Sequence, residues 1–177
     1  MVRKPNSMYR RIMGQAYTRK KYMGGIPGNR IVQYDIGDAR TKFPVAVHLV
    51  VDEPCQIRHI ALEAARISAN RYIAKMAGSG YHLKMRLYPH NVLRENKIAV
   101  GAGADRISQG MRGAFGSPVG TAARVRVGMR LITISTTDAN TQHAKEALRK
   151  GSSKLPTPCH IEIETGGKRA KYHPMGQ

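Results

Sequence analysis

The sequence is poor in acidic residues, in aromatic side chains and in cysteine. Its 177 residues contain no tryptophan, two phenylalanines and two cysteines, and 11 acidic residues stand against 30 lysines and arginines. Two cysteines do not build a disulfide framework, which indicates a reducing compartment. No stretch approaches the ~18 apolar residues of a membrane-spanning helix, and no apolar signal-peptide segment follows the basic N-terminus. These absences predict a cytoplasmic protein that does not enter a membrane.

The surplus of cations is the strongest signal in the composition. The formal net charge is +19 and the pI is about 10.5, while 41% of the residues are hydrophobic. Charge of this size strains a free globule by self-repulsion, so a polyanionic partner is expected. Nucleic acid, an anionic membrane surface and an acidic protein are the candidate partners on composition alone.

Residues 1–34 are predicted to form an extended arm. The segment contains eight cations and no acid, and tyrosines occur between the cations. Cations neutralise phosphates and tyrosine rings stack on exposed bases, which favours binding to RNA. A disordered cationic tail is the alternative. The eight candidate RNA-binding residues of the arm are Arg3, Lys4, Arg10, Arg11, Arg19, Lys20, Lys21 and Arg30.

Residues 35–164 are predicted to form a core domain. The apolar, β-branched run at residues 43–51 indicates a buried strand. The two acids and the proline at residues 52–54 are typical of a helix start, and Gly78 of a helix end, so a helix is expected as far as about residue 76. Its inner face is expected at Ile57, Ile60, Ala61, Ala64, Ile67 and Ser68.

Basic side chains alternate with apolar ones at residues 81–88, where Lys84 and Arg86 point away from the apolar face. This pattern predicts a half-buried antiparallel strand whose free face is cationic. Arg124 and Arg126 alternate with valines in the same way in a later predicted strand. These four cations are candidate phosphate contacts, with an ordinary solvated face as the alternative.

The remaining periodic segments complete a single α+β domain. Strands are expected at residues 97–100, 121–128, 131–135 and 159–163, a second helix at residues 137–150, and a short basic tail at residues 165–177. Strands and two helices without regular alternation predict a mixed or antiparallel sheet packed with two helices.

A long glycine-rich loop is predicted at residues 101–120. Its six glycines cost too much backbone entropy for a helix interior and offer too little side chain for a packed strand. Arg106, Arg112 and Phe115 suit a segment that orders against a surface outside the protein. Because strands are expected on both sides, the ends of the loop are expected to be fixed.

Neither a cofactor nor a metal is expected. Residues 101–103 begin like a dinucleotide fingerprint but lack its third glycine, and they lack the Gly-Lys-Ser/Thr ending of a P-loop. Cys55 with His59, and Cys159 with His160, do not form a recognised zinc motif. Core cysteines are the favoured interpretation.

An active site is not expected either. No paired carboxylates, nucleophile elbow or Ser/His/Asp arrangement can be recognised. The alternative function is an RNA-processing or RNA-modifying enzyme that uses His82, His90 and Asp105 as acid–base groups.

The segment at residues 103–125, with its Gly-Ala-Asp-Arg and Gly-Met-Arg-Gly-Ala-Phe-Gly runs, closely resembles one universal family of ribosomal proteins. The family comprises L10e of the archaeal and eukaryotic large subunit and its bacterial counterpart L16p. Supporting segments lie at residues 62–72, 88–90 and 146–149. The match runs from the arm to about residue 164. The short basic tail, in place of the long acidic tail of eukaryotic members, favours an archaeal source.

This resemblance implies a non-catalytic α+β domain seated on large-subunit rRNA, close to where aminoacyl-tRNA enters. It further implies that loop 101–116 reaches towards the peptidyl-transferase centre and the tRNA acceptor ends. Neighbouring ribosomal proteins are expected partners, and an autonomous homo-oligomer is not expected. The loop residues carried over by position are Gly103, Asp105, Arg106, Gly110, Arg112, Gly113 and Phe115.

Overall fold

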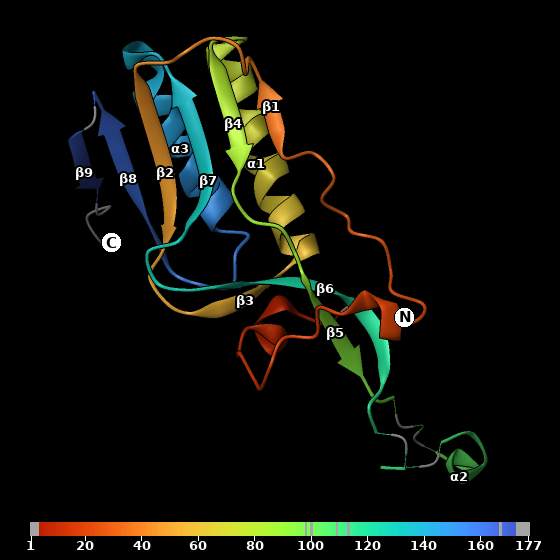
Figure 1. Ribbon diagram of the computed structural model, residues 1–177. Coiled ribbons are helices and arrows are strands. Elements are labelled where there is room, and N and C mark those ends of the chain that lie inside the picture. The colour runs from red at the N-terminus through yellow and green to blue at the C-terminus, as the bar shows by residue number, and fades with distance from the viewer. Residues whose placement is uncertain are drawn as a thin grey trace.

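The structure is a computed structural model, which describes residues 4–97, 99, 101–108, 110–112, 114–166 and 168–172. These residues include two antiparallel sheets and two long helices. The larger sheet has the strand order β1-β4-β7-β2-β8-β9, and the smaller has the order β3-β6-β5 (Figure 1). The strands are β1 Asp35–Gly37, β2 Val45–Val51, β3 Cys55–Arg58, β4 Tyr81–Met85, β5 Asn91–Glu95, β6 Ser117–Val125, β7 Arg130–Thr136, β8 Cys159–Thr165 and β9 Lys168–Tyr172.

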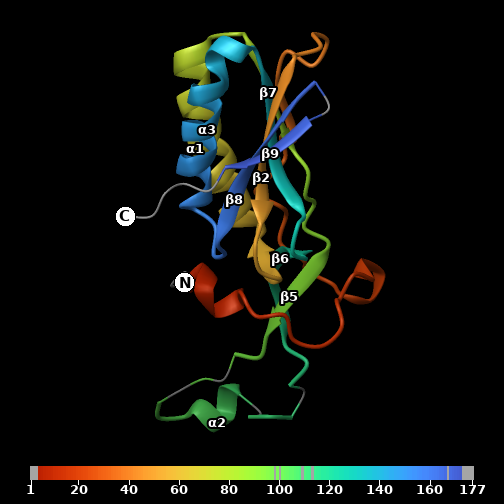
Figure 2. The same ribbon diagram turned by 90° about the vertical axis from the view of Figure 1, so that its left-hand side faces the viewer.

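Helices cover one face of the six-stranded sheet and leave the other open (Figure 2). The helices are α1 (His59–Ala77) and α3 (Thr141–Ser152). Val47 and Leu49 of β2 have no exposed surface and belong to the core beneath these helices. His48, between them, points to the open face because side chains alternate along a strand.

Small residues allow α1 and α3 to pack closely. A side chain added at Gly151 of α3 would come within 3.4 Å of the Ala65 carbonyl oxygen and 3.5 Å of the Ala69 Cβ. Ala61, Ala65 and Ala69 are all buried at a spacing of four residues. The contact therefore follows an alanine stripe, and this places the larger Ile67 outside it, 48% exposed. The predicted inner face is right at Ala61, and at Ile57, which belongs to β3; it is wrong by about one residue at Ala64 and Ser68, because Ala65 and Ala69 are buried instead.

The three-stranded sheet lies beyond one end of the larger sheet and carries the arm and the long loop (Figure 1). Its strand β3 corrects the predicted helix start, because residues 55–58 pair with residues 122–125 of β6 and α1 begins only at His59. The local helix signals at residues 52–54 are overridden by these cross-strand hydrogen bonds, which come from a distant segment.

The α+β class and the antiparallel sheet packed with two helices are confirmed. The strand predicted at residues 97–100 is wrong where it is described, because Lys97 and Ala99 are not in a strand. Ile98 and Val100 lie outside the described residues. The strand that leads to the loop is β5, which ends at Glu95. Residues 168–172 of the predicted tail return as β9 beside β8.

Candidate nucleic-acid interface

The arm is bound along the three-stranded sheet by backbone hydrogen bonds. Gln56 donates its backbone N–H to the Arg10 carbonyl at 2.8 Å and its side-chain amide to the Arg11 carbonyl at 2.8 Å. Tyr17 donates its N–H to Asn91 Oδ1 at 2.8 Å and accepts the N–H of Val92 at 2.9 Å. In its described residues, 4–34, the arm has only two short 3-10 turns, Asn6–Tyr9 and Lys20–Tyr22, so the polar groups of the sheet fix its path.

Side chains outside β3 and β5 add to this attachment. The Arg124 guanidinium donates to the carbonyls of Met13, Gly14 and Gln15 at 3.3, 2.9 and 3.0 Å. His59, at the start of α1, accepts the Arg30 N–H on Nδ1 at 2.8 Å. Burial lowers the pKa of His59, and the charges of Arg58 and Arg30 lower it further. A neutral imidazole is the form that can accept this hydrogen bond.

The predicted cations of the arm fall into two groups. Lys4 pairs with Glu95 at 3.0 Å, and Arg10 pairs with Glu53. The others that the structure describes are exposed and form no ion pair with a described carboxylate: Arg11, Arg19, Lys20, Lys21 and Arg30. Arg3 lies outside the described residues. Arg126, on the turn after β6, is exposed in the same way, whereas Arg124 is occupied by the arm.

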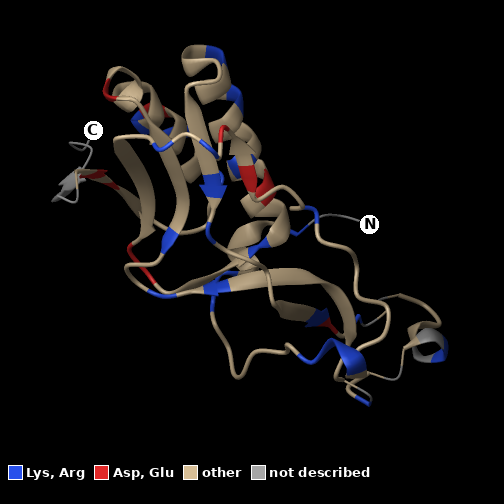
Figure 3. Cartoon of the chain, turned by 45° about the horizontal axis from the view of Figure 1, so that its top comes forward, with Lys and Arg blue, Asp and Glu red and all other residues tan. Residues whose placement is uncertain are grey.

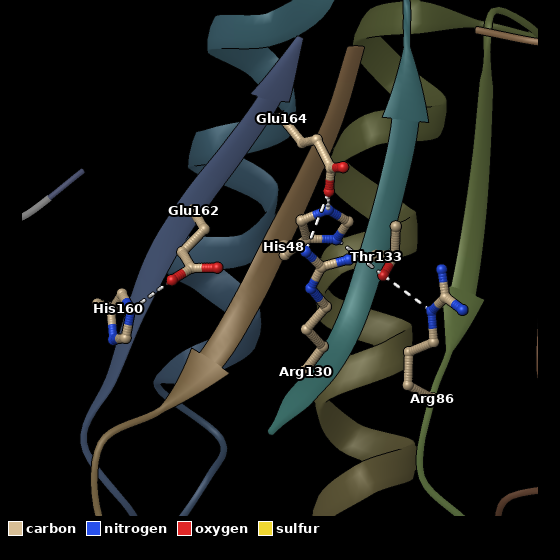
Figure 4. Close-up of polar contacts among 7 residues, drawn as sticks. All are labelled: His48, Arg86, Arg130, Thr133, His160, Glu162 and Glu164. Atoms are coloured by element: carbon tan, nitrogen blue, oxygen red, sulfur yellow. Dashed lines mark hydrogen bonds and ion pairs between the residues drawn. The ribbon is translucent and has the colours of Figure 1, made fainter. Parts of the chain in front are cut away.

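The open face of the six-stranded sheet has charges of both signs (Figures 3 and 4). Lys84 lies 3.5 Å from the Asp35 carboxylate, and Arg86 donates from Nε to Thr133 Oγ1 at 3.1 Å. The alternation within residues 81–88 could not reveal this, because the acids come from β1 and β8. A phosphate contact by Lys84 or Arg86 stays a prediction.

A buried histidine connects these charges. His48 is 2% exposed, with Thr133 Oγ1 3.1 Å from Nδ1 and Glu164 Oε2 3.2 Å from Nε2 (Figure 4). Arg130 also donates to Glu164, at 3.0 Å. An ionised carboxylate only accepts, so the proton of a neutral His48 lies on Nε2 and Thr133 donates to Nδ1. Burial lowers the pKa of His48, and the charge of Arg130 adds to this effect.

The long loop projects from the stem formed by β5 and β6, beyond the rest of the molecule (Figures 1 and 2). Arg94 of β5 donates from Nε to the Phe115 carbonyl at 2.9 Å, and its guanidinium carbon lies 3.4 Å from the Phe115 ring centre. Tyr17 of the arm meets the same ring edge-on, with 5.6 Å between ring centres. Phe115, where the loop rejoins the stem, is therefore fixed to the sheet by Arg94 and to the arm by Tyr17. The role of Arg94 was not predicted from the sequence.

Glycine is required where the loop rejoins the sheet. Gly116 has φ +75°, and a Cβ there would lie 2.5 Å from the Glu95 carbonyl carbon. Nearer the tip, Arg106 and Arg112 are exposed, and residues 104–107 form the short helix α2 (Ala104–Ile107). Gly103 and Gly110 both have positive φ. Gly113 and the side chain of Asp105 lie outside what the structure describes.

The three suggested acid–base residues do not form one site. His82 of β4 pairs with Asp35 at 3.1 Å, and His90 packs against Tyr88 with 4.7 Å between ring centres. Asp105 belongs to α2, which lies far from β4 at the end of the loop (Figure 1). The structure thus gives no geometric support to the alternative of an enzyme.

The described residues contain no group of three or more metal-binding side chains. His59 is occupied by the arm, and His160 pairs with Asp52 and Glu162. Burial raises the pKa of the Cys159 thiol to about 12, and the charges of Asp52 and Cys55 contribute. Such a thiol is a poor metal ligand and a poor nucleophile at neutral pH. None of the described helices is long and apolar enough to cross a membrane.

Sequence reasoning also missed a basic hollow on the outer side of the two helices. Four cations line it, in two pairs spaced by four residues: Arg71 and Lys75 of α1, and Lys150 of α3 with Lys154 in the turn after it. Lys150 Nζ lies 3.7 Å from the ring centre of Tyr72. The spacing of these cations was a usable signal, but only the packing of α1 on α3 brings the two pairs together.

The fold and its basic surfaces define a class of protein. It is an α+β domain with a basic arm bound along its small sheet and a projecting loop, and its charge favours a polyanionic partner. Residues 12–162 match the family of ribosomal protein L16p/L10e, and the chain belongs to this family. A large ribosomal subunit protein uL16 from Methanospirillum hungatei is 59% identical over 93% of this chain and 97% of its own length. Proteins with the same name from Methanocella arvoryzae and Thermoplasma acidophilum are 56% and 54% identical, over 97% and 94% of this chain and 100% and 95% of their own lengths. The resemblance seen in residues 103–125 is confirmed.

Proposed function

We infer that this chain is a structural constituent of the large ribosomal subunit in the cytoplasm, and not an enzyme. Its membership of the L16p/L10e family, at more than half identity to archaeal uL16 proteins, carries this conclusion. The partners are therefore rRNA and other proteins of the subunit. The net charge of +19 is suited to the phosphates of rRNA.

We propose that the exposed cations of the arm make most of the phosphate contacts. Because the arm is already bound to the sheet, little of its backbone entropy is lost when RNA binds. The six exposed candidates without a described ion pair are Arg11, Arg19, Lys20, Lys21, Arg30 and Arg126. At roughly 0.7 to 0.9 log units per contact, they predict a salt slope of about −4 to −5.

Salt titration of full-length protein with a large-subunit rRNA fragment tests this proposal. Replacing Arg19 and Lys21 with alanine is expected to reduce the magnitude of the slope by about 1.5. The control replaces Arg40 and Lys42 with alanine. Both residues are exposed between β1 and β2, and their replacement removes the same charge. A nearly flat slope, or equal losses in both variants, would contradict the proposal.

We further propose that the loop reaches the tRNA ends in the assembled subunit. Its fixed stem and its exposed tip, where Met111 is 75% exposed, support this role. A photo-crosslinker at Met111 should label the acceptor end of bound tRNA, while one at the exposed Val127 should not. Labelling of rRNA alone from Met111 would refute the assignment.

A further inference from the structure

A cavity of about 510 Å³ lies where the arm passes the junction of the two sheets. Two tyrosine rings line it: Tyr34, at the end of the arm, and Tyr88, after β4. The rings stack with 5.7 Å between their centres and 26° between their planes. Lys20, Asn29, Val32 and Thr121 also line the cavity.

Both rings are held in place before any ligand arrives. Tyr34 accepts the Met85 N–H on its carbonyl at 2.7 Å, and its hydroxyl lies 3.5 Å from the Ile31 carbonyl. The Tyr88 hydroxyl accepts a hydrogen bond from the Asn29 amide at 3.3 Å. His90 packs against the Tyr88 ring at 4.7 Å. A fixed aromatic surface binds a flat ligand with little loss of side-chain entropy.

A lysine of the arm, Lys20, lines the cavity beside the Tyr88 ring. Lys20 Nζ lies 6.0 Å from the centre of the Tyr88 ring, at the outer limit of a cation–π contact. Its ammonium can move to a phosphate and uncover the ring. No acid lines the cavity, and exposed Arg19 and Lys21 flank Lys20 in the chain.

The polar group inside the cavity has spare hydrogen-bonding positions. Asn29 uses one N–H on Tyr88, and its amide oxygen accepts from the Thr121 hydroxyl. A side-chain amide has two donors and an oxygen with two lone pairs. The Asn29 amide can therefore also form hydrogen bonds with the edge of a nucleobase, which presents both donors and acceptors.

We propose that this cavity binds one unpaired nucleobase of RNA. The base stacks on the tyrosine pair, its edge meets Asn29, and Lys20 binds a flanking phosphate. Aromatic rings, a cation and an amide are the groups by which proteins recognise bases that have left a helix. The inference rests on the proposed rRNA binding. It adds a site that binds a base, whereas the arm cations are proposed to contact phosphates.

The test uses the full-length protein and two RNA hairpins that contain one 2-aminopurine, either bulged or paired. Binding is followed by fluorescence anisotropy of an end label, and stacking by quenching of the 2-aminopurine. Wild type and Tyr88→Phe should quench the bulged base. Tyr88→Leu, which keeps the bulk without the ring, should abolish quenching and weaken binding of the bulged hairpin roughly 5- to 150-fold, with little effect on the paired one.

A second pair of variants tests the cavity while both tyrosines stay unchanged. Val32, at the rim of the cavity, is 73% exposed, and Val127, on a distant turn, is 62% exposed. Val32→Glu should reduce quenching of the bulged base, and Val127→Glu, which adds the same charge, should not. Quenching that survives both Tyr88→Leu and Val32→Glu would overturn the base site while leaving RNA binding intact. No anisotropy change with either hairpin, even at low salt, would instead overturn the proposed RNA binding itself.

Discussion

The strongest test of the interface concerns Arg124, which the sequence predicted as a phosphate contact and the structure places against the arm. Its guanidinium makes three hydrogen bonds to arm carbonyls. At about 1 kcal/mol for each exposed bond, these stabilise the bound arm by about 3 kcal/mol. The buried Nε has no partner among the described residues, which offsets about 1 kcal/mol of this. Arg124→Ala should therefore weaken attachment of the arm by about 2 kcal/mol, or roughly 30-fold in its opening equilibrium.

Hydrogen exchange of the free protein measures this opening directly. The amides of Gln56 and Val92 both donate to arm carbonyls, and they should exchange roughly 30-fold faster in Arg124→Ala. Arg126→Ala removes the same charge from an exposed side chain two residues away and should leave both rates unchanged. If Arg124→Ala leaves them unchanged as well, the arm does not depend on this arginine and the reasoning fails.

Three further predictions concern the loop and a buried histidine. Gly116→Ala should destabilise the protein by about 2 kcal/mol or more, because it adds a close contact to a positive φ. Gly110→Ala, which lies in open space within the loop, should leave the melting temperature nearly unchanged because the loop can relax; equal changes in melting temperature would contradict this. Deleting residues 103–113 should leave the melting temperature nearly unchanged but impair the assembled subunit, and a large thermal loss would oppose it. His59 has a lowered folded-state pKa, so the unfolded state binds more protons and stability falls as pH drops below about 6.5. His59→Gln should weaken this dependence in denaturant titrations and leave the part that comes from His48, whose pKa is also lowered; an unchanged pH profile would count against the assignment.

The sequence revealed the elements whose signals are local. Residues 45–51 form a strand because they are β-branched and apolar. The second predicted helix is present as α3, which buries Ala144, Ala147 and Leu148 on one face because they are spaced by three and four residues. The mixed charge of the surface around β4 could not be predicted, because Asp35 and Glu164 come from segments distant in sequence. The extent of α1 was missed for the same reason, since only pairing with β6 turns residues 55–58 into a strand.

The candidate interface, too, was predictable only in those features that depend on local sequence. Charge and glycine content indicated the arm and the loop, because composition alone determines those properties. The attachment of the arm through Asn91, Gln56 and His59 could not be predicted, because each of these side chains is ordinary in its own segment. Their role arises only where three elements meet.

The placement of the few acids has a consequence for how the protein approaches its partner. The six-stranded sheet and its helices hold Asp35, Glu63, Glu146 and Glu164, each in a salt bridge with a lysine or arginine. Beside the arm, the carboxylates of Glu53 and Glu95 are already neutralised by arm cations. The surface that remains is cationic on the arm and on the helices alike, where Arg71, Lys75 and Lys154 line the basic hollow. A polyanion therefore attracts more than one face of the protein and speeds its association over a wide range of orientations.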